Sequence, residues 1–168
     1  MTNPPNGGLF PTADGRDLIV SRTFRAPIED VWVSVTESDH TARWFGAWEG
    51  DAAPGRTIKL QMAYEEQTPW FDVRIDACDP PRRLALSTTG EEAGGWKLEL
   101  RLSHADGRTE LQLVHHLEST DQVGEMGPGW EYYLDMLVAS RDNLPTPSFD
   151  DYYPAMKAYY DSLATNGH

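Results

Sequence analysis

The stretch GPGWEYYLDMLVASRDN, residues 127–143, decides the fold because it carries the longest apolar pattern of helical period in the chain. Pro128 fits the first turn of a helix, and Asn143 fits the end of one. We therefore predict a helix over residues 127–143, about 24 Å long, which spans the width of about five strands. One face carries its apolar residues and ends on a cation: Trp130, Leu134, Leu137, Val138 and Arg141.

The segments ahead of this helix alternate between apolar and polar residues, which is typical of strands with one dry face and one wet face. The alternation is clearest in residues 57–64, 70–78, 96–102 and 109–117, and Asp106-Gly107 predicts a hairpin turn between the last two. An antiparallel sheet with a dry face needs cover. We therefore predict an α+β fold in which the long C-terminal helix covers an antiparallel sheet.

The first third of the chain predicts a strand followed by two short helices. Residues 17–26 have the β-branched content of a strand, Pro27 begins a helix, and a second helix begins at Ser38. Residues 1–15 are rich in proline and glycine, so they predict a loose arm.

Two segments flank the long helix. Residues 118–129 predict a mobile loop in which the glycines are hinges. After the helix, Pro154 predicts the start of a last helix that packs near Tyr132 and Met136. The alternative for the aromatic residues of this tail is a partner-binding patch.

Length and charge limit the classes of function. The chain has 168 residues and 39% apolar composition, so we expect one domain over residues 1–168. Its net charge of −13 argues against nucleic acid and anionic membrane surfaces as partners. The single cysteine, Cys78, excludes an internal disulfide, and no export signal or long apolar run is evident. We therefore expect a cytoplasmic protein.

Three short motifs resemble a known family. RTFRAPIEDVW (22–32), TARWFG (41–46) and GWEYYLDML (129–137) are similar to the START-like (SRPBCC) helix-grip superfamily. Within it they resemble the bacterial group named after the activator of Hsp90 ATPase homologue 1. The resemblance covers residues 17–143, and residues 144–168 form a C-terminal helical extension outside it.

The resemblance implies a curved antiparallel sheet wrapped around a long C-terminal helix, with an elongated apolar cavity between them. In this superfamily such cavities bind lipids, sterols, polyketides or plant hormones, and a few branches catalyse aromatic cyclisation. The eukaryotic namesake contacts the chaperone Hsp90. No cofactor is implied.

The predicted ligand site combines residues of the dry strand faces, the long helix and the second short helix. His115 either orients a ligand, moves a proton, or is a core histidine bonded to a backbone carbonyl, Arg141 or Tyr133. Arg141 either anchors an anionic group or extends to solvent. The predicted residues are Trp44, Phe45, Trp48, Met62, Tyr64, Phe71, Val73, Leu86, Trp96, Leu98, Leu100, Leu113, His115, Trp130, Tyr133, Leu134, Leu137 and Arg141.

Adjacent histidines on one strand cannot chelate a single ion, so we predict no metal site. The motifs of hydrolases, NTPases and dinucleotide-binding proteins are absent from the sequence. The leading hypothesis is a protein that binds a small hydrophobic molecule. The alternatives are a cyclase- or hydratase-type enzyme using His115, and an interaction module that contacts a chaperone or forms a homodimer.

Overall fold

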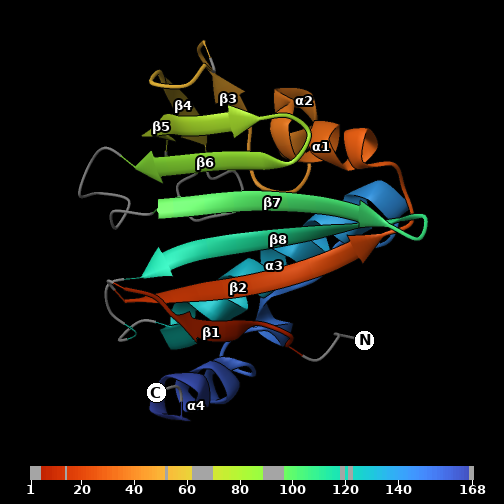
Figure 1. The fold of residues 1–168 in the computed structure, drawn as a ribbon. Coiled ribbons are helices and arrows are strands. Elements are labelled where there is room, and N and C mark those ends of the chain that lie inside the picture. The colour runs from red at the N-terminus through yellow and green to blue at the C-terminus, as the bar shows by residue number, and fades with distance from the viewer. Residues whose placement is uncertain are drawn as a thin grey trace. The chain divides into compact units, whose positions relative to one another are not determined.

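The computed structural model describes residues 5–13, 15–51, 53–61, 70–88, 97–117, 120 and 123–166. Its strands form one sheet in the order β1-β2-β8-β7-β6-β5-β4-β3 (Figure 1). Together with the long helix α3 this confirms the predicted α+β class. The elements are β1 (Gly8–Pro11), β2 (Arg16–Phe24), α1 (Ile28–Thr36), α2 (Ser38–Thr41), β3 (Trp48–Glu49), β4 (Thr57–Gln61), β5 (Trp70–Asp79), β6 (Arg83–Thr88), β7 (Lys97–Ala105), β8 (Arg108–Leu117), α3 (Val123–Asp142), η2 (Phe149–Asp151) and α4 (Lys157–Asn166).

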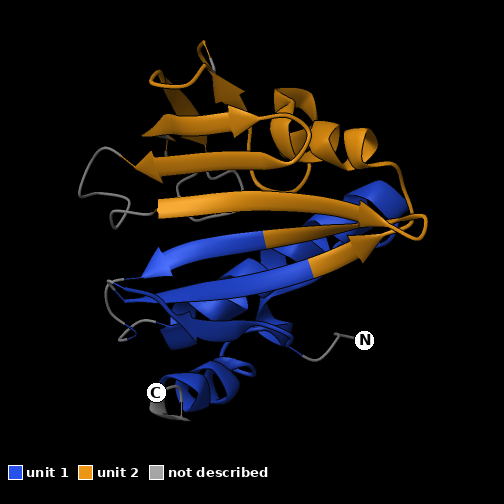
Figure 2. Ribbon diagram, in the orientation of Figure 1, with its two compact units in different colours: residues 1–21, 113–168 blue, residues 22–112 orange. Residues whose placement is uncertain are grey.

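The chain divides into two compact units. Unit 1 contains residues 1–21 and 113–168, and unit 2 contains residues 22–112 (Figure 2). Strands β2 and β8 each run from one unit into the other.

Unit 2 is an antiparallel meander with two short helices. The predicted hairpin turn is confirmed, because Asp106 and Gly107 both adopt positive φ, 53° and 76°. Beside this turn, the buried Thr109 hydroxyl donates to the carbonyl of Ala26 over 2.7 Å, which ties the hairpin to the chain ahead of α1. The core of unit 2 includes Val31, Val35, Trp44 and Phe45 and, from the predicted inward positions of the strands, Ile58, Val73, Ile75, Leu84 and Leu100. The alternation is incomplete, because Ala85 and Glu99 are also buried while Leu86 and Leu98 are half-buried.

Helix α3 of unit 1 begins earlier than predicted, at Val123 rather than Gly127. Pro128 therefore lies inside the helix and does not mark its start. Residues 123–129 are helical, so the predicted loop is wrong there, while residues 118–119 and 121–122 lie outside the described residues. The reason is burial, since Val123, Gly127 and Pro128 are all inaccessible to solvent. Packing thus stabilises a turn that residue preferences alone disfavour.

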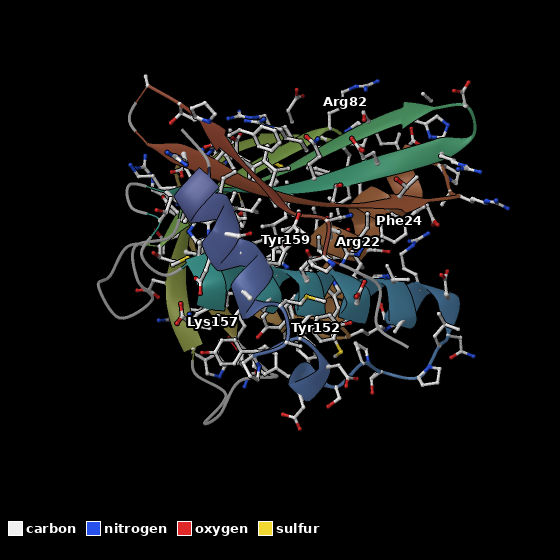
Figure 3. The ribbon with its side chains drawn as sticks, turned by 90° about the horizontal axis from the view of Figure 1, so that it is seen from below. Arg22, Phe24, Arg82, Tyr152, Lys157 and Tyr159 are labelled. Atoms are coloured by element: carbon white, nitrogen blue, oxygen red, sulfur yellow. The ribbon has the colours of Figure 1, made fainter. Side chains whose placement is uncertain are left out.

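Two glycines of α3 allow close contact with α4. A Cβ on Gly124 would lie 2.3 Å from a carboxylate oxygen of Asp161, and one on Gly127 would lie 2.4 Å from the ring of Tyr160. Gly127 therefore allows the Tyr160 ring to pack directly on α3, whereas the flexible Asp161 side chain could move away from a Cβ on Gly124. Figure 3 shows α4 beside α3, with Lys157 and Tyr159 of α4 labelled.

Gly127→Ala tests this contact. We expect it to lower the free energy of unfolding by about 1–3 kcal/mol, because the new methyl group overlaps a buried ring. Gly129→Ala is the matched control, since nothing lies within 4 Å of its Cβ position. There alanine ought to be neutral or stabilise the helix by up to about 1 kcal/mol. Urea unfolding measures both, and equal effects of the two substitutions would contradict the close contact.

The described part of the N-terminal arm is not loose, contrary to the prediction for residues 1–15, of which residues 1–4 and 14 lie outside the described residues. Residues 8–11 form β1, which pairs antiparallel with β2 from Gly8–Ile19 to Pro11–Arg16. Ahead of β1, the amides of Asn6 and Gly7 donate to Oε2 of Glu131 over 2.8 and 3.2 Å.

Glu131 of α3 is a fully buried carboxylate, with 0% of its surface exposed. Besides the two amides of the arm, its Oε2 accepts a hydrogen bond from the hydroxyl of Tyr160 in α4. The neighbouring Tyr159 hydroxyl donates to the carbonyl of Gly7 over 2.7 Å. One carboxylate group therefore holds the N-terminal arm and the C-terminal helix to α3.

Tyr160→Phe ought to be more destabilising than Tyr159→Phe. The first removes a hydrogen bond to a buried charge, which contributes about 1.5–3 kcal/mol, and the second removes a neutral one worth about 0.5–1.5 kcal/mol. Urea unfolding of both variants checks the order. If Tyr159→Phe cost as much as Tyr160→Phe, the carboxylate would not be the main anchor.

The C-terminal tail packs against α3 as predicted, although α4 begins at Lys157 rather than Pro154. The Tyr152 hydroxyl donates to Oδ2 of Asp135 over 2.7 Å, and the rings of Tyr152 and Tyr132 are 5.5 Å apart. The buried residues of the tail are Tyr152, Met156 and Tyr160.

Candidate functional site

His115 of β8 is the buried polar residue on which the candidate site centres. Only 3% of its surface is exposed, and Leu113 and Leu117 on the same strand face are also buried. The next residue, His116, is partly exposed, and its Nδ1 lies 2.6 Å from a carboxylate oxygen of Asp17. Strand alternation therefore predicted correctly which of the two histidines points inward.

The partner of His115 is Trp130 of α3, also in unit 1. The indole Nε1–H donates to Nδ1 of His115 over 3.1 Å, and the rings meet edge to face with centroids 5.9 Å apart. Because Nδ1 accepts this bond, the neutral ring carries its proton on Nε2. The sequence prediction named a backbone carbonyl, Arg141 or Tyr133 as partners and missed Trp130, because no sequence pattern links a strand residue to a donor on a helix.

Burial lowers the pKa of His115 from 6.5 to about 4, and the nearby His116 contributes in the same direction. The imidazole is therefore neutral at pH 7. It is a polar group without charge in an apolar environment, so it can form hydrogen bonds without the cost of burying an ion.

The other predicted residues of unit 1 surround this pair from α3. The ring of Tyr133 lies 6.1 Å from that of Trp130, and both residues are buried. Leu134 and Leu137 are completely buried, whereas Arg141 in the last turn is half-buried. These side chains are therefore shielded from solvent, and we expect a molecule that binds here to enter only when some of them move.

The other predicted residues with a described structure belong to unit 2. Trp44 and Phe45 are buried and meet edge to face at 5.9 Å. The indole of Trp44 donates to the Ser34 carbonyl over 3.0 Å, and that of Trp48 donates to the Thr36 carbonyl over 2.8 Å, so both anchor to α1. Val73 and Leu100 are buried, and Leu86 and Leu98 are half-buried. Met62, Tyr64, Trp96 and the side chain of Phe71 lie outside the described residues.

Two buried carboxylates were missed by sequence reasoning. One is Glu131. The other is Glu99 of β7, which accepts hydrogen bonds from Arg83 over 2.6 Å and Arg101 over 2.8 Å. Arg83 and Arg101 lie directly opposite each other on β6 and β7. Glu99 thus offsets the repulsion between two facing cations.

The described residues contain no group of three or more His, Cys, Asp or Glu side chains that could hold a metal ion. Cys78 is a free thiol whose pKa is raised by burial and, to a smaller degree, by Asp79. Within the described part of the chain, no helix is long and apolar enough to cross a membrane.

The stability of the protein ought to depend on the protonation of His115. Its pKa is about 4 when folded against 6.5 when unfolded, so the unfolded chain binds the proton more tightly. The neutral imidazole therefore contributes to the free energy of unfolding. This contribution is fully present above pH 6.5, and about 3 kcal/mol of it is lost as the pH falls towards 4.

His115→Gln isolates this effect, because the glutamine oxygen still accepts from Trp130 but does not titrate. Urea unfolding of both proteins between pH 7 and pH 4 should show a steeper decline for the parent. Parallel pH curves would contradict the lowered pKa.

The comparisons with known proteins identify the family. The family model described as "Activator of Hsp90 ATPase homolog 1-like protein" matches residues 25–140. The chain belongs to this family. The match confirms the resemblance found in the sequence. The C-terminal extension, residues 144–168, lies outside the matched region. No curated protein matches the chain.

Solved structures confirm that this family member has the START-like helix-grip fold. CalU16 from Micromonospora echinospora has 28% sequence identity, covers 95% of this chain and 96% of its own, and has a TM-score of 0.76. A protein from Bordetella parapertussis has 25% identity, 100% and 96% coverage and a TM-score of 0.70. The Aha1 dimer from Colwellia psychrerythraea has 19% identity, 76% and 95% coverage and a TM-score of 0.60, and it shows the fold alone.

Proposed function

We propose that this protein binds a small hydrophobic molecule of lipid-, polyketide- or aromatic-like character, with His115 fixing its orientation. The observation that carries the proposal is a neutral, buried imidazole whose tautomer is set by a neighbouring indole. Membership of the family supports it, because the superfamily resemblance implies a ligand held against the C-terminal helix.

The chemistry of the site selects a mainly apolar molecule that carries an oxygen. Nδ1 of His115 accepts from Trp130, so Nε2–H is the donor that a carbonyl or hydroxyl oxygen of the ligand takes up in the complex. The neighbouring Tyr133, Leu134 and Leu137 offer apolar surface for the rest of the molecule. A charged ligand group beside the imidazole would lose its hydration without gaining an opposite charge from the ring.

The lowered pKa favours binding over acid–base catalysis. A general acid or base is most effective when its pKa lies near the working pH, whereas that of His115 is about 4. At pH 7 the ring carries no proton that it can readily give up as an acid, and it is a weak base. The cyclase- or hydratase-type alternative would therefore need a ligand that raises this pKa.

The burial of α3 side chains affects the dynamics of binding. Leu134 and Leu137 have no exposed surface, so we expect the ligand to enter only when side chains or backbone around them move. Binding that requires such a change is slower than simple docking of preformed surfaces. We therefore expect association rates that saturate as the ligand concentration rises.

The experiment starts with native mass spectrometry of the purified protein, followed by a binding screen of apolar molecules with and without a carbonyl or hydroxyl group. For an oxygen-bearing ligand, His115→Phe should weaken binding roughly tenfold, the equivalent of one hydrogen bond. An apolar analogue without the oxygen should bind the parent and the variant equally.

His116→Phe is the matched control, because it makes the same change one residue away on the partly exposed side of β8. It should leave binding unchanged. Equal losses in the two variants, or a screen in which no apolar molecule binds the parent protein, would overturn the proposal.

A further inference from the structure

Phe149 of η2 is an exposed ring on a rigid aromatic support. It has 43% of its surface exposed, although its ring and that of Tyr132 in α3 form a T-shaped pair with centroids 5.3 Å apart. It also stacks on Tyr153 at 6.1 Å and 18°. Tyr132 in turn contacts Tyr152, whose hydroxyl donates to Asp135 (Tyr152 is labelled in Figure 3). These contacts fix the ring without burying it.

Two exposed aspartates follow Phe149 in the chain. Asp150 and Asp151 follow Phe149 directly in η2, and both are exposed. Residues 142–156 contain no lysine, arginine or histidine. The local negative charge has the same sign as the net charge of −13, so the field at this surface attracts cations and repels anions.

We propose that Tyr132, Phe149, Asp150, Asp151 and Tyr153, the Phe149 patch, bind an arginine-containing basic segment of a partner protein. A guanidinium group is planar, so it can pack on the exposed part of the Phe149 ring while its N–H groups donate to Asp150 or Asp151. A purely apolar partner would strip water from the carboxylates without replacing it, and an acidic partner would be repelled. Ring and charge together therefore select a basic segment rather than either alternative.

The Phe149 patch is independent of the proposed ligand site. Most of its residues lie in the extension beyond residues 25–140, the region that the family model matches. It shares no residue with the group around His115. Binding of a partner here can therefore be present or absent whatever the outcome of the ligand screen.

A blocked tetra-arginine peptide is the probe. Titrated into the isotope-labelled full chain, it should shift the backbone amide resonances of Tyr132 and of residues 142–153 more than those elsewhere. Phe149→Leu keeps an apolar side chain but removes the aromatic face, so affinity should fall about threefold, whereas Phe149→Tyr should retain it. Tetra-lysine should bind more weakly than tetra-arginine, because an ammonium group cannot stack as a plane.

The role of the two carboxylates is tested by comparing two double variants that remove the same amount of charge. Asp150→Asn combined with Asp151→Asn should weaken binding about five- to tenfold. Glu49→Gln combined with Asp51→Asn removes the same charge from two exposed positions in unit 2 and should change affinity less than twofold. Equal losses in the two double variants would show attraction to the whole acidic chain and overturn the proposal. Larger peptide-induced shifts elsewhere in the chain than at Tyr132 and residues 142–153, or unchanged affinity in Phe149→Leu, would overturn it as well.

Discussion

The packing of unit 1 depends on the hydrogen bonds that one buried carboxylate requires. Glu131 has no access to water, so the free energy of its hydration must be replaced by protein donors. Those donors include the amides of Asn6 and Gly7 and the hydroxyl of Tyr160. They come from the two ends of the chain. Detaching either end would leave charge buried with fewer donors, so the arm and α4 are held in place together.

The same constraint accounts for the glycines of α3. The ring of Tyr160, whose hydroxyl donates to Glu131, lies directly against Gly127. A larger residue at position 127 would have to displace this ring. Close helix packing and the hydrogen bond to the buried carboxylate therefore depend on the same side chain.

Sequence patterns predicted those features that repeat along the chain. Period-two alternation placed His115 inside and His116 outside. The apolar helical face from Trp130 to Leu137 was also predicted correctly, because several residues at helical spacing indicate the same buried face. Single residues were ambiguous. Gly127 and Pro128 suit a helix start as well as a helix packed closely on another, and the difference depends on Tyr160, far away in the sequence. The partners of Glu131 and His115 were beyond prediction for the same reason, since donor and acceptor lie on different elements.

The two outermost strands of the described sheet bear on how copies of the chain associate. Strand β3 has two residues, Trp48–Glu49, and β1 has four and ends at Pro11, which has no amide hydrogen to donate. A strand from another molecule would find few backbone N–H and C=O groups to pair with at either edge of the sheet. Such short edge strands protect a sheet against edge-to-edge aggregation. Where copies of this protein do assemble, we expect side-chain surfaces rather than a continued β-sheet to hold them together.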